Sequence, residues 1–169
     1  MAKQISLRDF QHGLVKRLRE AQSEAEPTSR LGVQAGARNW LLRLDDAGEM
    51  LPLPEVSNVP LTKSWYLGIA NIRGVLASVV DFAAFMGGEP TVRTPDSRLV
   101  LIAERFGSFS GLLISRMLGL RNVQNLEASD QAPDRPWVGA AYRDGEGRVW
   151  QELNIGALAV HDNFLHVGA

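Results

Sequence analysis

A single arginine stands inside the most apolar stretch of the sequence, and it is the residue whose surroundings offer most chemistry. The stretch GIANIRGVLASVVDF (residues 68–82) is rich in isoleucine, leucine and valine, and Arg73 lies within it between Gly68 and Gly74. A permanent cation in a buried strand is costly unless a carboxylate pairs with it. Glu49, upstream of the preceding extended segment, is the best candidate. Because a planar guanidinium can grip a carboxylate through two hydrogen bonds, we predict an Arg73–Glu49 pair.

The sequence leaves two roles open for Arg73. In the first, the arginine is an internal strut that locks two strands together. In the second, it stands at the mouth of a groove where a partner touches it, and the neighbouring glycines let another chain approach the backbone closely. Asp81 follows the same apolar stretch, where enzymes often place a catalytic carboxylate. A helix N-cap explains Asp81 more simply, because its side chain then satisfies free backbone donors.

The remaining residue types give no sign of catalysis or of metal binding. The histidines His12, His161 and His166 lie near the termini, without zinc-site spacing beside a carboxylate. The segment GSFSG (residues 107–111) resembles a nucleophile elbow, but its central position is Phe109. No phosphate-binding glycine loop is present. We therefore predict no catalytic residue, no metal and no cofactor.

The composition narrows the class of protein further. The 169 residues suit one domain or two small subdomains that share a core, and the formal net charge of −1 gives no field that attracts nucleic acid or anionic lipid. The sequence has no cysteine, which excludes disulfides and thiolate chemistry. It also has neither an apolar run of membrane-spanning length nor a signal-peptide core. We expect a cytoplasmic protein without nucleic-acid binding or direct membrane insertion.

The first residues have the period of an amphipathic helix. Leu7, Phe10, Leu14 and Leu18 fall on one face of it, with basic residues opposite. We expect residues 1–26 to form this helix and a linker. Packing of the helix against its own domain is favoured over a role at a membrane surface or at a partner.

After the first thirty residues, short apolar stretches recur with turn residues between them, which is typical of an all-β fold. Two stretches of similar texture, residues 31–82 and 98–153, flank a linker-like segment, residues 87–97. Each ends in a short helix, capped by Asp81 in the first and by Asn154 in the second. Because the long helices that cover a parallel sheet are missing, we predict a pair of small barrels or sandwiches. The tryptophans are expected to be core anchors.

The stretch 68–82 resembles the signature of the CheW-like coupling family: a Gly, then Asn, an aliphatic residue, Arg and Gly, followed by an apolar strand and an Asp. The residues that carry this resemblance are Gly68, Asn71, Ile72, Arg73, Gly74, Val79, Val80, Asp81 and Phe82. Glu49 falls where the family has an acidic residue upstream. The segments RLVLIAERFGSFSGLLISRMLGL and GRVWQELNIGALA resemble the later strands of the family. The likeness therefore covers roughly residues 30–160.

Several positions depart from the family pattern. Ser78 replaces a frequent proline, Arg116 stands where an acidic residue is frequent, and Gln151 with Glu152 interrupts an apolar closing strand. Together with the added N-terminal helix, these departures indicate a specialised branch. Our hypothesis is the branch that serves type IV pilus (twitching) signalling, and a flagellar chemotaxis coupler is the alternative.

The resemblance implies a fold and a function. The fold is all-β and CheW-like over residues 27–165: two SH3-like five-stranded β-barrels that share a core, with the N-terminal helix and short helices after the strands. The function is that of a non-catalytic adaptor between the regulatory domain of a CheA-type histidine kinase and the cytoplasmic tip of a methyl-accepting chemoreceptor. Asp81 is then a structural cap. The receptor groove runs between the barrels, near Glu49, Gly68, Asn71, Arg73 and Gly74.

Two other classes of protein stay as alternatives. An enzyme would need an ionisable cluster in a pocket, and Glu49, Arg73 and Asp81 form the only one that the sequence offers. Nucleotide or metal binding with micromolar affinity would favour that reading. A small-barrel nucleic-acid binder would need a basic face, and retention on heparin at physiological salt would favour it. Neither class has a motif in this sequence.

Overall fold

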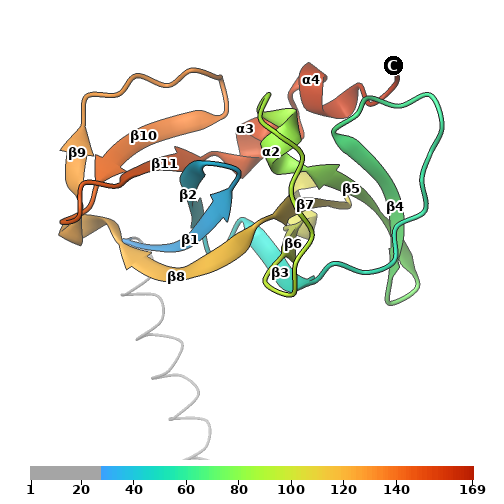
Figure 1. Cartoon of the computed structure of the whole chain (residues 1–169), viewed down its shortest axis with the longest axis horizontal. Helices are drawn as coiled ribbons and strands as arrows, with labels where there is room; N and C mark the ends of the chain where they lie inside the picture. The colour runs from blue at the N-terminus through green and yellow to red at the C-terminus, as the bar shows by residue number, and fades with distance from the viewer. Residues whose placement is uncertain (1–27) are drawn as a thin grey trace, which may run out of the picture.

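The computed structural model describes residues 28–169, which form two β-sheets lying side by side (Figure 1). The predicted N-terminal helix lies outside the described residues. Two short helices, α2 (Phe82–Phe85) and α3 (Ile155–Ala159), lie at the junction of the sheets, and α4 (Asp162–Leu165) lies close to the C-terminus (Figure 1).

The described part of the chain has one sheet of six strands and one of five. The six-stranded sheet has the order β8 (Arg116–Asn122), β1 (Ser29–Ala35), β2 (Arg38–Arg43), β11 (Val149–Leu153), β10 (Val138–Arg143) and β9 (Glu127–Ser129). The five-stranded sheet has the order β3 (Ala47–Pro52), β6 (Arg98–Ile102), β7 (Ser110–Ile114), β5 (Val75–Asp81) and β4 (Tyr66–Ile72). The all-β class is therefore confirmed. The larger sheet exceeds the expected five strands, and its edge strand β9 has only three residues.

The five-stranded sheet is inserted, in the order of the chain, between the second and third strands of the six-stranded sheet. The strands β1 and β2 belong to the six-stranded sheet, β3 to β7 build the five-stranded sheet, and from β8 onward the chain returns to the first. This arrangement differs from the expected division into residues 31–82 and 98–153. The alternation of apolar residues shows which side chains face the core, but it does not show which strand is the neighbour. The parallel pairs β2–β11 and β5–β7 therefore had no sequence signal.

The main hydrophobic core contains residues from both sheets and from the three helices. The ring of Trp40 packs edge-on against that of Phe82, with the ring centroids 5.1 Å apart. A second, smaller cluster belongs to the five-stranded sheet and includes Val79 and Leu99. The prediction that the tryptophans are core anchors is confirmed: Trp40, Trp137 and Trp150 are buried, and Trp65 packs against the main cluster.

Both predicted helix caps are present. Asp81 is buried, and its Oδ1 accepts a hydrogen bond from the Ala84 N–H at 3.3 Å. The Asn154 Oδ1 accepts one from the Ala157 N–H at 2.9 Å. The Asp81 carboxylate also accepts hydrogen bonds from the backbone N–H and the hydroxyl of Thr91, both at 2.7 Å. Asp81 therefore caps α2 and also holds the segment that follows this helix.

Gln151 on β11 contradicts the rule that buried polar groups are paired. Its side chain is only 4% exposed, and its Nε2 has no hydrogen-bond partner in the described part of the protein. A buried donor without a partner costs roughly 1–3 kcal/mol. We expect Gln151→Met, which keeps the shape of the side chain, to raise the free energy of unfolding by about 1 kcal/mol. Urea unfolding would measure this, with the exposed Gln131→Met as a control that should change nothing; a destabilised Gln151→Met variant would contradict it.

Asp144 organises the turn between β10 and β11. Its carboxylate accepts hydrogen bonds from the indole N–H of Trp150 (3.0 Å), the backbone N–H groups of Glu146 and Arg148 (both 3.0 Å) and the Arg148 guanidinium (2.8 Å). The indole donor contributes most to holding the pKa of Asp144 well below its usual range, and the backbone and guanidinium donors lower this pKa further.

A lowered pKa in the folded state makes the ionised Asp144 a stabilising group. This contribution is complete above the unfolded pKa of about 3.9 and is lost as the pH falls from there through the lowered folded value. We expect Asp144→Asn to reduce the melting temperature at pH 7 and to lose that difference progressively below about pH 4. Melting curves of both proteins between about pH 2 and pH 7 would test this. A difference that stays constant across this range would contradict it.

Candidate functional site

Arg73 does not lie within a buried strand. It occupies the tight turn between β4 and β5, where Arg73 and Gly74 have φ angles of +52° and +86°. Two successive residues with positive φ are the mark of a type I′ hairpin turn. The expectation of a cation inside an apolar core is therefore wrong: the apolar stretch is two strands, and the arginine projects from their connection. Its side chain is 75% exposed.

The predicted ion pair is present nevertheless. The Arg73 Nη1 donates to the Glu49 Oε2 at 2.7 Å, and the Arg73 Nη2 donates to the Glu49 Oε1. Both Nη atoms of the guanidinium therefore donate to the same carboxylate. The hydrogen bonds and charge of Glu49 raise the pKa of Arg73 above its usual value. Because both side chains are open to solvent, the pair contributes little to stability, and a strut inside the core is excluded.

The local sequence fixes the turn that carries Arg73. The Asn71 Oδ1 accepts a hydrogen bond from the Gly74 N–H at 2.8 Å. Glycine adopts the positive φ of position 74 without steric cost. The motif Asn-Ile-Arg-Gly therefore places one arginine at the tip of a hairpin.

A groove of about 340 Å³ runs beside this ion pair. We call it the hairpin groove. Its lining comes from Gly48 and Glu49 of β3, from the tip of the β4–β5 hairpin, and from the end of β6 with the residues that follow it. The residues that line it are Gly48, Glu49, Ile72, Arg73, Val75, Leu101, Ile102, Glu104 and Phe109. Val75 is 50% exposed, so the groove combines an oriented charge pair with accessible apolar surface.

Gly68 lies apart from this groove. It precedes Arg73 by five positions on β4, which corresponds to roughly 16 Å along an extended strand. Its φ is +133°, and a Cβ at this position would lie 2.0 Å from the backbone oxygen of Ser57. Ser57 bridges to the next residue, Ile69. The close approach that the glycine permits is therefore made by the protein's own chain.

The ionisable cluster that an enzyme would need does not form. Asp81 lies at the far end of β5 from the hairpin tip, roughly 20 Å away along the strand, and Thr91 and Ala84 occupy its carboxylate. Residues 28–169 contain no group of three or more His, Asp or Glu side chains that could hold a metal ion. Of the predicted site residues, the structure brings Glu49 and Arg73 together, with Asn71 and Gly74 supporting the turn.

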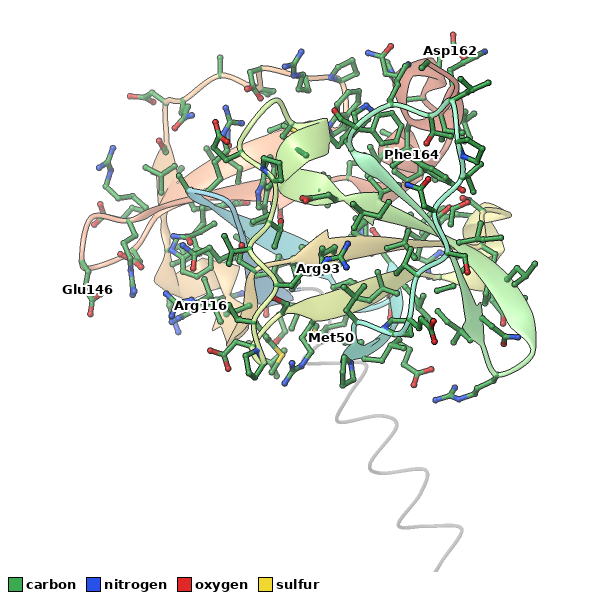
Figure 2. All side chains as sticks on the ribbon, turned by 45° about the vertical axis from the view of Figure 1, so that its right-hand side comes forward. Met50, Arg93, Arg116, Glu146, Asp162 and Phe164 are labelled. Carbon is green, nitrogen blue, oxygen red and sulfur yellow. The ribbon has the colours of Figure 1, made fainter. Side chains whose placement is uncertain are left out.

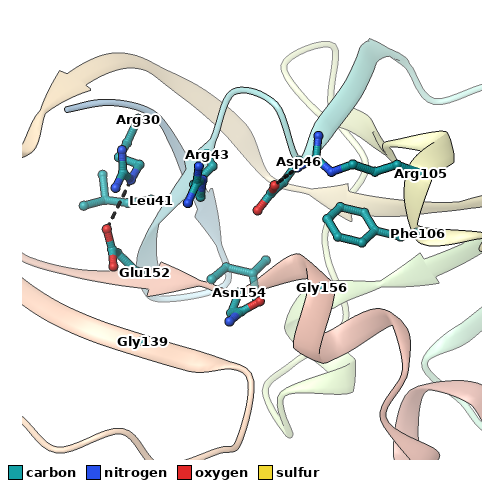
Figure 3. A pocket seen from close by; sticks show the side chains of 11 residues that line it. Arg30, Leu41, Arg43, Asp46, Arg105, Phe106, Gly139, Glu152, Asn154 and Gly156 are labelled. Atoms are coloured by element: carbon teal, nitrogen blue, oxygen red, sulfur yellow. Dashed lines mark hydrogen bonds and ion pairs between the residues drawn. The ribbon is translucent and has the colours of Figure 1, made fainter. Parts of the chain in front are cut away.

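A second concave site was missed by the sequence analysis. A cleft of about 440 Å³, here called the inter-sheet cleft, lies where strands of the six-stranded sheet and the start of α3 meet Asp46 and the residues that connect β6 to β7 (Figure 3). The Arg30 Nε donates to the Glu152 Oε1 at 3.1 Å on one side, and Arg105 pairs with Asp46 on the other. Arg43 projects between them (Figure 3). Arg105 and Asp46 are 59 positions apart in sequence, so no local pattern indicated their contact.

The two sites are close neighbours in the fold. The short 3-10 helix η1 (Glu104–Phe106) separates them: Glu104 lines the hairpin groove, while Arg105 and Phe106 line the inter-sheet cleft. The hairpin groove and the inter-sheet cleft therefore lie on either side of η1.

These features define a class of protein: an all-β domain of two sheets whose concave surfaces carry paired charges. Comparison with known proteins agrees with this class. Residues 30–163 match the model of the CheW-like domain. The chain belongs to the CheW-like family.

Two individual proteins illustrate the relationship. The chain is 30% identical over 154 residues to "Protein PilI" of Pseudomonas aeruginosa, and the match covers 87% of this chain and 84% of that protein. Its fold is similar to that of the scaffolding protein TtCheW from Thermoanaerobacter tengcongensis, with a TM-score of 0.63 and 17% identity over 75% of this chain and 88% of the other. Within residues 28–169, no helix is long and apolar enough to span a membrane.

Proposed function

We propose that this protein is a non-catalytic, cytoplasmic adaptor that couples methyl-accepting chemoreceptors to a CheA-type histidine kinase, with residues 27–165 as the coupling domain. The observation that supports this most is the hairpin groove. It presents Arg73, held by Glu49 through two hydrogen bonds, beside the exposed side chain of Val75 and the half-buried ring of Phe109. Such a surface orients a partner and needs no nucleophile or metal.

The pathway that we propose is the one controlling type IV pilus (twitching) motility. The similarity to a protein named PilI supports this assignment over a flagellar pathway. In this proposal, the receptor tip occupies the hairpin groove, with Glu49 and Arg73 in direct contact and with Asn71 and Gly74 shaping the turn. Gly68 acts indirectly, by allowing Ser57 to pack against β4.

The test is calorimetric titration of the full chain with the regulatory domains of the pilus and flagellar CheA-type kinases from the same organism. We expect saturable one-to-one binding to the pilus kinase, with a Kd in the micromolar range, and binding at least about tenfold weaker to the flagellar kinase. Preference for the flagellar kinase would overturn the pathway. No binding to either domain at about 100 μM would overturn the adaptor assignment.

A further inference from the structure

A third concavity, of about 370 Å³, lies at the start of β4. We call it the loop pocket. It is lined by residues 56, 58–64, 66 and 67 together with Arg93, which belongs to the segment between α2 and β6. Figure 2 shows Arg93 near the middle of the view. The loop pocket shares no lining residue with the hairpin groove or the inter-sheet cleft, so it is a separate surface.

Lys63 and Arg93 bring two positive charges to the loop pocket, and no Asp or Glu is among the described residues that line it. Neither cation forms an ion pair with any of residues 28–169. The Lys63 backbone is fixed, because its N–H donates to the Val167 carbonyl at 2.8 Å. Its Nζ lies 5.8 Å from the ring centre of Trp65. Cations that share a concave surface without a carboxylate attract an anionic group.

Leu61, at the rim of the loop pocket, has an unfavourable backbone conformation. Its φ is +59°, a left-handed conformation that a large non-glycine residue rarely adopts. Its side chain is 88% exposed, the highest exposure among the large apolar residues of the described part of the chain. The backbone there is ordered, since the Leu61 carbonyl accepts a hydrogen bond from the Ala169 N–H at 2.9 Å. Residues held in such strained conformations cluster at ligand-binding and functional sites, and among residues 28–169 no contact buries the exposed side chain of Leu61.

The exposed apolar side chain at the rim of the loop pocket indicates the kind of ligand. Val56, Val59 and Leu67 pack against the hydrophobic clusters, whereas Leu61 projects into solvent beside the cations. A free inorganic anion would leave Leu61 exposed to water. A carboxylate attached to a peptide would pair with the cations, and an adjacent apolar residue of the same peptide would cover Leu61.

We propose that the loop pocket binds an acidic segment of a partner protein. An aspartate or glutamate side chain of that segment pairs with Lys63 and Arg93, and an adjacent apolar residue packs against Leu61. This interaction is additional to the proposed receptor contact at the hairpin groove. It gives the adaptor a second docking surface at the opposite end of β4.

The test uses the capped peptide acetyl-Leu-Asp-Glu-Leu-amide, added to the isotope-labelled full chain and followed by amide chemical shifts. We expect saturable shifts confined to residues 57–67 and Arg93, with a Kd of about 1 mM, as befits a short flexible probe. The neutral counterpart acetyl-Leu-Asn-Gln-Leu-amide should bind at least about fivefold more weakly, because the charge contact is lost. Equal shifts with both peptides, or none with the acidic one, would overturn the proposal.

Two variants localise the charge contact. Arg93→Gln should weaken binding of the acidic peptide at least about threefold. Arg135→Gln, at an exposed arginine outside the loop pocket, should leave it unchanged. An equal effect of both variants would point to nonspecific charge attraction and would overturn the site. Inorganic phosphate is the third ligand to be tested. If phosphate binds at Lys63 and Arg93 more tightly than the acidic peptide does, the ligand of the loop pocket is a free anion, and the proposal of a protein segment is overturned.

Leu61→Gly separates binding from folding. Glycine adopts a φ of +59° without strain, so the melting temperature should stay the same or rise. The affinity for the acidic peptide should nevertheless fall at least about threefold, because the apolar contact is removed. An unchanged affinity would overturn the assigned contact with Leu61. A gain in stability with a loss in binding is a combination that a merely structural residue would not show.

Discussion

Replacing Gly68 by alanine is expected to lower the free energy of unfolding by more than about 3 kcal/mol. An added Cβ would lie 2.0 Å from the backbone oxygen of Ser57, so Ser57 and its neighbours would have to move away from β4. This movement would break the two backbone hydrogen bonds between Ser57 and Ile69, which are 2.8 and 2.9 Å long. The φ of +133° adds conformational strain. Urea unfolding of the variant would measure the loss.

Gly74→Ala is the matched control for this substitution. Gly74 also has a positive φ, of +86°, but nothing lies within 4 Å of the position that its Cβ would occupy. It should therefore cost only the conformational penalty, about 1 kcal/mol. Equal losses for Gly68→Ala and Gly74→Ala would show that the close approach of Ser57 is not decisive.

This difference between two glycines of the same motif affects how binding defects are interpreted. A Gly68 variant that loses its partner would do so because β4 and the Ser57 segment separate, and not because a contact with the partner disappears. The melting temperature must therefore be measured beside every binding constant at this position.

The all-β class of the fold was predictable because it depends on local sequence patterns. Short apolar strands with turn residues between them indicated an all-β protein, and Asp81 and Asn154 were recognised as helix caps from their position after a strand. The partner of Arg73 was also predicted correctly, but from an assumed burial that the structure does not show, since an arginine that is 75% exposed does not require a carboxylate. The strand and cap inferences depend only on residue type and short-range spacing.

The position of Arg73 was predicted wrongly for a physical reason. The residues on either side of the turn, Ile72 and Val75, are both apolar, so two antiparallel strands look like one long strand in sequence. The common signal for a type I′ turn is Asn-Gly or Asp-Gly, and this chain places Arg before the glycine instead. The hydrogen bond that the Gly74 N–H donates to the Asn71 Oδ1 supports the turn, and that contact becomes visible only in the folded chain.

The concave sites were harder to predict from the sequence, because each is formed by segments that are far apart along the chain. The inter-sheet cleft depends on β1, β10 and β11 meeting the residues around η1, and the loop pocket depends on Arg93 reaching the loop before β4. Such contacts follow from the interleaving of the two sheets. The periodicity of single strands carries no information about that interleaving.

If the proposed receptor contact is correct, exchanging the charges of Glu49 and Arg73 is expected to weaken binding of a receptor-tip fragment while leaving the fold intact. The pair is exposed, so each single variant, Glu49→Arg or Arg73→Glu, should shift the melting temperature by no more than about 2 °C. Each should weaken binding of a receptor-tip fragment at least about tenfold, because an oriented charge is removed and a repulsive one takes its place. Thermal melting and calorimetry on the same samples would separate the two effects.

The double variant decides which role Arg73 has. Glu49→Arg with Arg73→Glu can re-form an ion pair, but it presents a carboxylate where the receptor would meet a guanidinium. If Arg73 contacts the receptor, the fold of the double variant is normal and its binding stays at least about tenfold weaker than that of the natural protein. If the pair only holds the hairpin against β3, binding recovers fully. Full recovery would assign the docking surface to the apolar walls of the hairpin groove, and Arg73 would then only position the turn.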